Sequence, residues 1–484
     1  MDIKELEPKK LWQFFYELTQ IPRPSKKERK AVEYVKKFAE DRGLEVVVDE
    51  VGNVIVRKPA TSGMENKKGI ILQAHLDMVP QKNSDVEHDF EKDPIQAYVD
   101  GEWVTAKGTT LGADNGIGVA AALAVLDSDD IKHGPIEALF TIDEETGMTG
   151  AFNLKPGLLK GDILINLDSE DEGELYIGCA GGMDATMTFN YKEVEPVTGS
   201  TAYKVEIKGL KGGHSGIDIN LGRGNANVIL ARFIYSLSKD MNVGLAEFSA
   251  GNMRNAIPRE GYAVVTVDNP SLFEEKVKEF ELILKNEYGK VEPELEFFAT
   301  KTELPAKIMA ADDKKRIINA IVATPNGVIR MSNDMPDLVE TSTNLAIVNI
   351  KNGKAEIMAL MRSSVDSAKK ALADVFEALY TLAGADKIEF AGEYPGWKPN
   401  PDSPILRIMK EQYKNLFGKI PEVKAIHAGL ECGLLGGIYP NWDMISIGPT
   451  IRYPHSPDEK VNIPSVKKFW DFLIHTLENV EDKK

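Results

Sequence analysis

Histidines and carboxylates that could bind a metal recur at the ends of apolar segments. The run ILQAHLDMVP places His75 and Asp77 two residues apart, in a chain with only seven histidines. Further positions of this kind are Asp114 in GADNG, Glu144 and Glu145 in IDEETG, Asp168 in NLDSE, and His455 in HSPDE. Carboxylates gathered in one cleft repel each other and must be protonated or neutralised by a cation. Two histidines with several carboxylates suit a pair of Zn²⁺ ions bridged by one carboxylate.

A metal pair about 3.5–4 Å apart could hold a hydroxide and polarise a carbonyl oxygen. Of the neighbours Glu144 and Glu145, one could bind metal while the other takes a proton from bound water. Each motif alone also has a structural interpretation. Adjacent glutamates are usually solvated, a histidine at a strand end is often structural, and GADNG and DSE are common turns and helix caps. Their order on successive apolar segments favours a shared metal site.

The segments that carry these residues have the pattern of an α/β domain. GIILQAHLDMV, IEALFTIDE and DILINLDSE are continuous apolar runs, which are typical of strands buried on both faces of a sheet. Helical spacing is present in LWQFFYELTQIP, ERKAVEYVKKFAEDRG and DNGIGVAAALAVLDS. The alternation predicts a mixed, largely parallel sheet flanked by helices. Ligands of such sheets bind beyond the carboxyl ends of the strands, so we expect the acids and histidines to meet in one cleft.

The pattern changes after about residue 200. AYKVEIKGL and GYAVVTVDN alternate apolar and polar residues, as strands with one exposed face do. The order strand, helix, strand occurs twice, which suggests a duplicated topology. After YPGWKPNPDSP the helix and strand signals resemble those of the first segment again. We therefore expect one catalytic domain formed by residues 1–186 and 398–484, with residues 187–397 inserted as a two-lobed α+β lid domain.

Composition excludes several classes of partner. The net charge of -17 argues against binding to nucleic acid or to an anionic membrane. No apolar stretch approaches the roughly 18–20 residues needed to span a bilayer, and the charged amino terminus lacks the apolar core of a signal peptide. Two cysteines, Cys179 and Cys432, provide no disulfide framework, which fits a reducing cytoplasm. A thiol nucleophile would leave the carboxylates without a role.

The ordered motifs resemble a known family. AHLDMVPQ, GTTLGADNGIG, DEETGM, NLDSE, GLKGGHSG and GPTIRYPHSPDE are similar to the di-zinc metallopeptidases that include aminoacylase, carnosinase and bacterial dipeptidases. KPATSGMENKK, CAGGMD, RNAIPRE, TPNGVIR, YPGWKPN and HAGLECG resemble the bacterial aminoacyl-histidine dipeptidases within that family. The resemblance spans nearly the whole chain. It implies that His75 and Asp168 bind one zinc, that Glu145 and His455 bind the other, and that Asp114 bridges them.

The resemblance also implies roles for three residues beside the metals. Glu144 would be the general base, and Asp77 would orient the imidazole of His75 from behind. His214 in GGHSG would be a lid histidine that stabilises the oxyanion of the tetrahedral intermediate. Without the family, GGHSG is equally well explained as a tight turn with an exposed histidine.

Four more positions are candidates for binding the substrate. Arg362 in MALMRSS and Asn255 in RNAIP could hold the substrate carboxylate, the arginine through a bidentate pair. An arginine at the end of a strand is also common as a solvated charge. His427 and Gly429 belong to HAGLECG, which resembles a substrate-carboxylate loop whose glycines allow close backbone approach.

The family implies a metal-dependent dipeptidase that hydrolyses Xaa-His dipeptides, including β-alanyl-histidine. The cofactors would be two Zn²⁺ ions, with Mn²⁺ or Co²⁺ as possible substitutes. The partners would be a small dipeptide and a second copy of the chain in a homodimer. A broader dipeptidase and an N-acyl-amino-acid deacylase are alternatives within the hydrolases. A non-catalytic zinc- or peptide-binding protein is an alternative of another class, which the presence of Glu144 disfavours.

Overall fold

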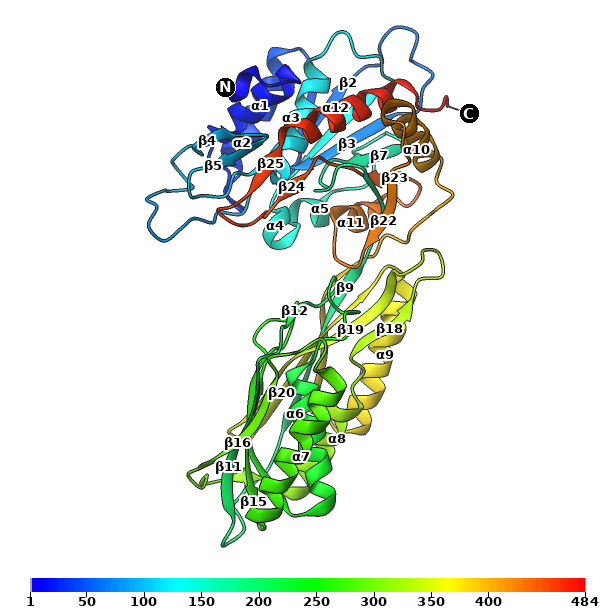
Figure 1. Cartoon of the computed structure of the whole chain (residues 1–484). Helices are drawn as coiled ribbons and strands as arrows, with labels where there is room; N and C mark the ends of the chain where they lie inside the picture. Colours follow the sequence, from blue (N-terminus) through cyan, green and yellow to red (C-terminus); the bar gives the residue numbers. More distant parts are fainter. Residues whose placement is uncertain (1, 484) are drawn as a thin grey trace. The chain divides into compact units, whose positions relative to one another are not determined.

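The computed structural model describes residues 2–483, and the chain divides into two compact units (Figure 1). Unit 1 consists of Met1–Gly178, Pro399–Ala425 and Leu430–Lys484, and unit 2 of Cys179–Lys398 and Ile426–Gly429. The boundary expected between residues 186 and 187 falls inside strand β9 (Gly181–Asn190), whereas the compact units change between Gly178 and Cys179. This strand pairs along its whole length with β20 (Lys354–Ser363), so the chain changes unit before β9 begins.

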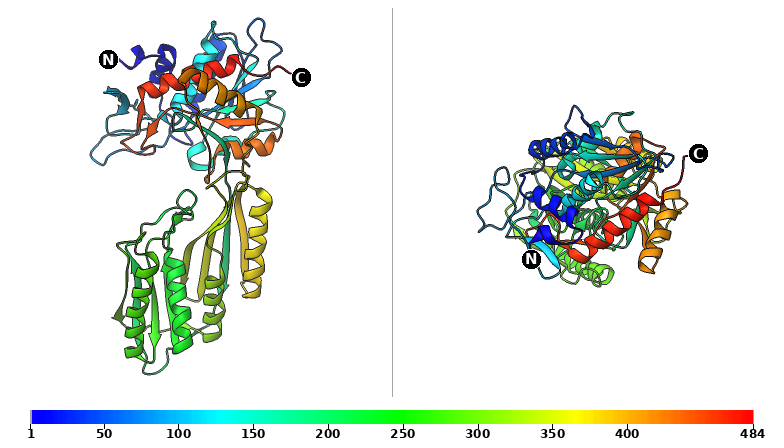
Figure 2. Two further views of the ribbon diagram at one scale, coloured as in Figure 1. Left: turned by 45° about the vertical axis from the view of Figure 1, so that its right-hand side comes forward. Right: turned by 90° about the horizontal axis from the view of Figure 1, so that it is seen from above.

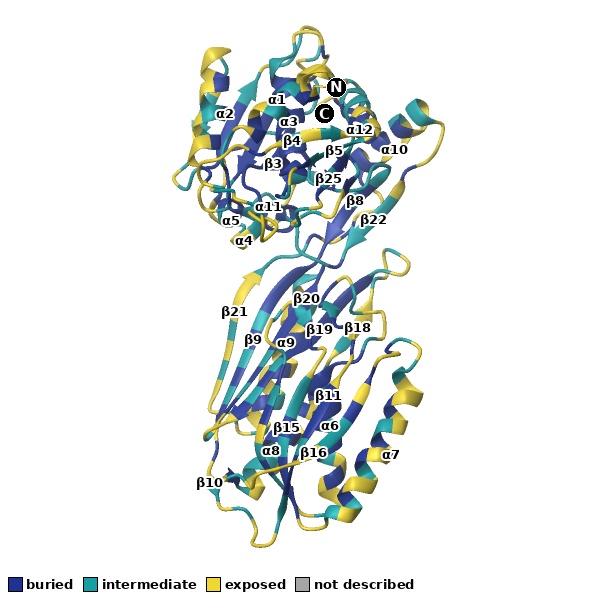
Figure 3. Cartoon of the chain, turned by 60° about the vertical axis from the view of Figure 1, so that its left-hand side comes forward, coloured by how far each residue is buried: buried dark blue, intermediate teal, exposed yellow. Residues whose placement is uncertain are grey.

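Unit 1 is built on an eight-stranded mixed sheet of order β1-β2-β6-β3-β7-β23-β8-β22. The strands are β1 (Glu45–Val48), β2 (Val54–Lys58), β3 (Ile70–His75), β6 (Ile136–Thr141), β7 (Ile163–Asn166), β8 (Glu174–Cys179), β22 (Glu422–Ile426) and β23 (Asp443–Ser446). The central strands β6, β3, β7 and β23 run parallel to one another. β3 is buried along its whole length, as its continuous apolar run predicts (Figure 3). The expected fold class is confirmed.

Helices flank this sheet. They are α1 (Lys9–Thr19), α2 (Arg29–Asp41), α3 (Ala113–Asp127), α4 (Glu144–Gly147), α5 (Thr149–Asn153), α10 (Pro404–Phe417), α11 (Glu431–Ile438) and α12 (Ile463–Glu478), with a 3₁₀ turn η1 (Ile3–Glu5). α3 packs against β3 and α1, and α10 packs against α12 (Figure 2). The small residues of α3 permit close approach, since a Cβ on Gly116 would lie 3.1 Å from the ring of Phe15 in α1.

A smaller four-stranded sheet of order β24-β25-β5-β4 completes unit 1. Its strands are β4 (Ala97–Asp100), β5 (Trp103–Ala106), β24 (Ile451–Arg452) and β25 (Lys460–Asn462). Within residues 2–483, none of the helices combines the length and apolar character that crossing a membrane requires.

Unit 2 contains a nine-stranded antiparallel sheet, formed by the path β16-β11-β15-β13-β19-β20-β9-β21 and by β18, which pairs with β19. The remaining bounds are β11 (Thr201–Lys208), β13 (Val243–Ala250), β15 (Gly261–Val267), β16 (Glu296–Thr302), β18 (Gly327–Met331), β19 (Val339–Lys351) and β21 (Lys387–Tyr394). The helices are α6 (Ala226–Asp240), α7 (Pro270–Tyr288), α8 (Ala311–Ala323) and α9 (Asp366–Leu382). Two short ladders pair β10 (Glu193–Val194) with β17 (Ile308–Met309), and β12 (Gly213–His214) with β14 (Ala256–Ile257).

The two halves of unit 2 repeat one topology. In the first half, the helix α7 connects β15 to β16, and β11 lies between those strands. In the second half, α9 connects β20 to β21, and β9 lies between them. Within the sheet, the halves are joined where β13 pairs with β19, over Phe248–Ile350, Ser249–Asn349 and Ala250–Val348. The two lobes therefore share one continuous sheet.

Candidate metal centre

The parallel strands of unit 1 bring the acids and histidines together at one edge. His75 is the last residue of β3 and pairs with Thr141, the last residue of β6. Asn166 ends β7, which is parallel to β3 on its other side. The segments that follow these strand ends carry Glu144 with Glu145, and Asp168, respectively. Parallel strands deliver their carboxyl ends to the same side of a sheet, so these acids converge beside His75.

Asp114 lies between the two histidines. Its Oδ1 is 3.1 Å from Nε2 of His75, and its Oδ2 is 3.2 Å from Nε2 of His455. Asp114 has non-helical backbone angles at the start of α3, after Gly112 in the left-handed region at φ +74°. His455 also has a positive φ of 59°, a conformation that non-glycine residues adopt mainly where a site requires it.

Each histidine faces a second carboxylate. Nε2 of His75 lies 3.3 Å from Oδ1 of Asp168, and Nε2 of His455 lies 2.9 Å from Oε2 of Glu145. Ligand atoms of His75, Asp114 and Glu145 all lie within 4.8 Å of one another. Glu145 Oε1 and Asp168 Oδ1 are buried without a hydrogen-bond donor. Two imidazoles, three carboxylates and two unsatisfied buried oxygens are a donor set that fits divalent metal ions.

The electrostatics of the cluster also call for positive charge. Burial opposes protonation of His75, but the nearby carboxylates of Asp168 and Asp114 outweigh it and raise the pKa of His75 well above its ordinary value. Contacts with Asp114 and Glu145 raise the pKa of His455 to about 11. Burial and the neighbouring acids raise the pKa of Asp168 to about 7. The cluster therefore holds protons on its two histidines and on Asp168 where no other cation balances its carboxylates.

Asp77 links a histidine to the acidic pair of α4. Its Oδ1 lies 3.3 Å from Nδ1 of His75, on the opposite side of the ring from Asp114. The backbone N–H groups of Glu144 and Glu145 donate to Oδ1 and Oδ2 of Asp77, at 3.0 and 3.2 Å. Despite burial, the contact with His75 and these bonds lower the pKa of Asp77 to about 2. Burial and the charges of neighbouring acids raise the pKa of Glu144 well above its ordinary value.

In unit 2, His214 and Arg362 lie in one cluster. The N–H groups of Gly216 and Ile217 donate to Nδ1 of His214, at 3.2 and 3.1 Å, so the imidazole proton is on Nε2. Nε2 of His214 is 3.4 Å from Nη2 of Arg362. Burial and the charge of Arg362 lower the pKa of His214 to about 4, so its ring is neutral at neutral pH. Two N–H donors therefore stand next to each other.

Arg362 is only 4% exposed, yet among residues 2–483 it forms no ion pair with an acid. Its guanidinium group bonds instead to neutral oxygens, Tyr394 Oη at 3.1 Å and Ser215 Oγ at 3.3 Å. A buried cation with no anionic partner is costly unless an anion joins it.

The other candidates of unit 2 have different surroundings. His427 is buried, and its Nε2 lies 2.7 Å from Oγ of Ser342, whereas its Nδ1 has no hydrogen-bond partner. Burial and the charge of Arg362 lower the pKa of His427 to about 3. Gly429 belongs to the same short segment of unit 2, Ile426–Gly429. Asn255 has an exposed side chain, and its carbonyl oxygen accepts from Ser215 N at 2.9 Å.

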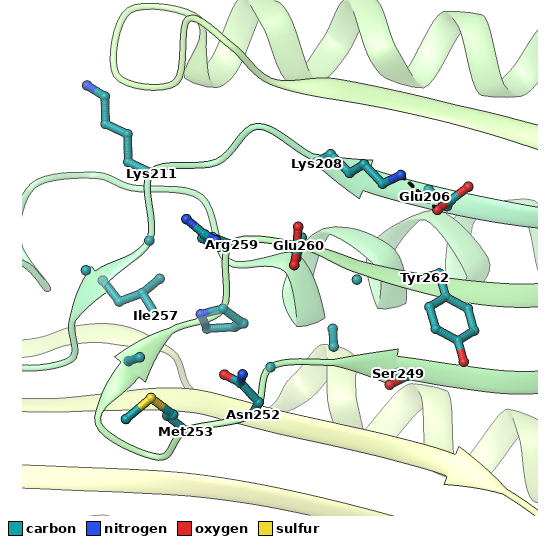
Figure 4. A pocket seen from close by; sticks show the side chains of 17 residues that line it. Glu206, Lys208, Lys211, Ser249, Asn252, Met253, Ile257, Arg259, Glu260 and Tyr262 are labelled. Carbon is teal, nitrogen blue, oxygen red and sulfur yellow. Dashed lines mark ion pairs between the residues drawn. The ribbon is translucent and has the colours of Figure 1, made fainter. Parts of the chain in front are cut away.

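A cavity of about 650 Å³ lies beside β12 and β14, and the candidate residues do not line it (Figure 4). Lys208, Lys211, Arg259 and Glu206 stand on its walls, with Nζ of Lys208 3.2 Å from a carboxylate oxygen of Glu206. Its charges are exposed or already paired, so it is less suited to a specific ligand than the two clusters.

The sequence interpretation missed Arg23, Glu170, Glu431 and Glu459, all of which lie close to the metal cluster. Burial and the nearby acids raise the pKa of Glu170 to about 8. Glu431 accepts hydrogen bonds from side chains of β3 and β6, and its Oε1 is buried without a partner. Glu459 and Glu431 stand inside the motifs HSPDE and HAGLECG. Their place in these motifs is the sequence signal by which they could have been found.

Comparison with known proteins agrees with this arrangement. Residues 71–479 match the model of peptidase family M20/M25/M40. The cytosol non-specific dipeptidase of Escherichia coli (strain K12) is 47% identical over 484 residues, which is 100% of both chains. The crystal structure of the aminoacylhistidine dipeptidase from Vibrio alginolyticus superposes with a TM-score of 0.95 and 50% identity, covering 100% of this chain and 99% of that one.

A more distant structure shows the same fold. Aminopeptidase PepT from Bacillus cereus ATCC 10987 has a TM-score of 0.57 and 17% identity, with 98% of both chains covered. The family model and the two full-length relatives confirm the resemblance that the motifs predicted. This chain belongs to peptidase family M20/M25/M40.

Proposed function

We propose that this metallo-dipeptidase of the M20 family hydrolyses dipeptides with a carboxy-terminal histidine, β-alanyl-histidine among them, with two zinc ions. The observation that carries the proposal is the position of Asp114, whose two carboxylate oxygens face His75 and His455. Each of these histidines also faces one further acid. This geometry supports His75 with Asp168 for one ion and His455 with Glu145 for the other. Mn²⁺ and Co²⁺ suit the same donors.

Zinc, when bound, supplies a Lewis acid and lowers the pKa of water. Glu144 takes a proton from the attacking water and later gives it to the leaving amine. Its raised pKa favours acceptance of that proton. Oδ1 of Asp77 lies 3.3 Å from Nδ1 of His75 and so directs the Nε2 lone pair toward the cleft. Because Asp77 also accepts from the N–H of Glu144, one carboxylate orients both a metal ligand and the base.

The cluster of unit 2 supports the binding of an anionic group of the substrate. Arg362 is a buried cation that has no acidic partner among the described residues 2–483, and Nε2–H of His214 stands beside it. In this proposal, Arg362 binds the substrate carboxylate and His214 donates to the oxyanion. Asn255, His427 and Gly429 are proposed to contact the substrate as well.

The names of the two full-length relatives differ in the substrate specificity that they state. One is an aminoacylhistidine dipeptidase and the other a non-specific dipeptidase. A broader dipeptidase is therefore the second candidate, and an N-acyl-amino-acid deacylase the third. The word cytosol in the name of the Escherichia coli relative supports a cytoplasmic location for this protein. We also propose a homodimer, on the family resemblance alone.

The test is release of histidine from β-alanyl-histidine by protein that has been stripped of metal and then reloaded with zinc. Zinc-dependent release is expected, with glycyl-leucine and N-acetyl-histidine as comparison substrates. Cleavage of glycyl-leucine at an equal kcat/KM would replace Xaa-His specificity by the broader dipeptidase. Cleavage of N-acetyl-histidine alone would replace it by the deacylase.

A further inference from the structure

The segment between α1 and α2 carries an arginine that is buried beside the metal cluster. Arg23 is 1% exposed and lies outside the residues that match the family model. Its Nη1 donates to the carbonyl oxygens of Leu76 and Asp77, both at 2.9 Å, and its Nη2 donates to the carbonyl oxygen of Gly112 at 2.6 Å. One guanidinium group therefore joins the backbone that follows His75 to the backbone that precedes Asp114.

Glu459 binds the second of these segments through its amide groups. Its Oε2 accepts from the N–H groups of Leu111 and Gly112, at 2.8 and 2.9 Å, and its Oε1 accepts from the N–H of Asp114 at 3.1 Å. Glu459 is 2% exposed. Gly112 is thus held at its N–H by Glu459 and at its carbonyl oxygen by Arg23.

The packing leaves these two side chains little freedom. A Cβ on Gly112 would lie 2.7 Å from Nη2 of Arg23 and 2.9 Å from Sδ of Met78. A Cβ on Gly116 would also lie 2.7 Å from Nη2 of Arg23, and 3.1 Å from the ring of Phe15. Glycine at both positions therefore leaves room for the guanidinium group. Its backbone partners all belong to the two segments that carry Asp77 and Asp114.

A purely structural role predicts a different outcome from a positioning role. If the buried charges of the arginine and the glutamate served folding alone, their exchange for neutral groups would lower stability and change nothing else. Here Arg23 holds the backbone on both sides of the gap between His75 and Asp114, which is 3.1 Å between Nε2 and Oδ1, and Glu459 holds the backbone on the Asp114 side. A shift of either segment changes the separation of two metal-binding side chains.

We propose that Arg23 and Glu459 are positioning residues of the metal centre, which set the distance between the His75–Asp77 segment and Asp114 without touching the metal. The inference rests on the proposed zinc centre. It adds two residues, from the two ends of the chain, on which the affinity for zinc depends.

The experiment measures zinc affinity of the full-length protein by competition with a chelator, together with the melting temperature of the metal-free protein. The variants are Arg23→Gln, Arg23→Lys and Glu459→Gln. In Glu459→Gln, the new NH₂ group opposes at least one backbone N–H whichever way the amide turns. Both glutamine variants are expected to weaken zinc binding about 10- to 100-fold, as the loss of groups that orient ligands does. The zinc affinity of Arg23→Lys should lie between those of the glutamine variants and of the unchanged protein, because lysine keeps the charge but lacks the forked N–H donors of the guanidinium group.

Unit 1 offers a matched pair of controls. Arg57 is a largely buried arginine that donates to Glu137 and to the carbonyl oxygen of Leu158, and Glu137 accepts from the N–H groups of Lys160 and Gly161. Arg57→Gln and Glu137→Gln remove the same kinds of bond on strands β2 and β6. They should lower the melting temperature and leave zinc affinity unchanged.

The absorption spectrum of the Co²⁺-loaded protein gives a second measurement, since it reports ligand geometry. It should change in Glu459→Gln and not in Glu137→Gln. Unchanged zinc affinity in Glu459→Gln and Arg23→Lys would overturn the positioning role, even if Arg23→Gln did not fold. Failure of the unchanged protein to bind zinc would instead refute the proposed metal centre, and the positioning role with it.

Discussion

Replacing Asp77 by asparagine removes one charge and turns one carboxylate oxygen into an NH₂ group, at a position where both oxygens accept hydrogen bonds. Oδ1 accepts from Glu144 N at 3.0 Å and lies 3.3 Å from Nδ1 of His75. Oδ2 accepts from Glu145 N at 3.2 Å and from Ser25 Oγ at 2.8 Å. No orientation of an amide can satisfy all of these donors.

The less costly orientation sets the expected size of the effect. With the amide nitrogen in place of Oδ1, it opposes both Glu144 N–H and His75 Nδ1–H. With the nitrogen in place of Oδ2, it opposes only Glu145 N–H, because the hydroxyl of Ser25 can rotate and accept. One hydrogen bond to a charged group is then lost, which costs about 1.5–3 kcal/mol. If that energy falls on the metal-bound state, zinc affinity decreases about 10- to 100-fold, since 1.4 kcal/mol is a factor of ten.

The assay is competition for zinc between the Asp77→Asn protein and a chelator, with kcat measured at saturating zinc. The matched control is Asp443→Asn. Asp443 accepts from Ser403 Oγ at 2.6 Å and Ile405 N at 2.8 Å, at the amino end of β23 and so at the opposite edge of the sheet. The control should be less stable to heat and should bind zinc normally. Normal zinc affinity in Asp77→Asn would refute the view that this carboxylate orients the metal ligand and α4.

Three further outcomes are expected. Glu144→Gln should retain zinc while kcat falls about 10²- to 10⁴-fold, the usual contribution of a general base, and near-normal turnover would remove Glu144 from the mechanism. The folded pKa values of His214 and His427, about 4 and 3, lie below the ordinary value of 6.5, so the unfolded chain binds protons first as the pH falls. The contribution of these two histidines to stability should therefore decrease on acidification below about pH 6.5, so the melting temperature of His427→Gln should rise relative to that of the unchanged protein as the pH falls, as melting curves at several pH values can show. Gly118→Ala should destabilise unit 1 by about 1–3 kcal/mol through overpacking against Leu167, which urea unfolding would measure.

The sequence pattern was sufficient to place the side chains of the proposed metal centre on the fold. His75, Glu145 and Asp168 follow apolar runs long enough for buried strands, and buried strands in series imply a parallel sheet with a common carboxyl edge. The structure places these strands side by side as β6, β3 and β7. The convergence of the side chains follows from local periodicity and from a general property of parallel sheets.

Long-range pairing explains what the sequence did not indicate. The boundary expected near residue 187 falls inside β9, which pairs with β20 across about 170 positions of chain, a pairing that no local pattern records. The single sheet of unit 2 likewise depends on three residue pairs between β13 and β19. Local periodicity indicates that a strand exists but not which strand it pairs with.

The amino-acid sequence by itself determined the types of side chain available for metal binding, the strands that carry them and, through its motifs, the family. Only the tertiary structure decided which groups hold those strands' ends in place. Arg23 bonds to a carbonyl oxygen 89 positions away, and Glu459 to an amide 345 positions away. Both use backbone partners, and every residue offers the same carbonyl and amide groups, so the sequence carries no signal for such bonds. They exist because folding closes these separations to 2.6 and 3.1 Å, within normal hydrogen-bond range.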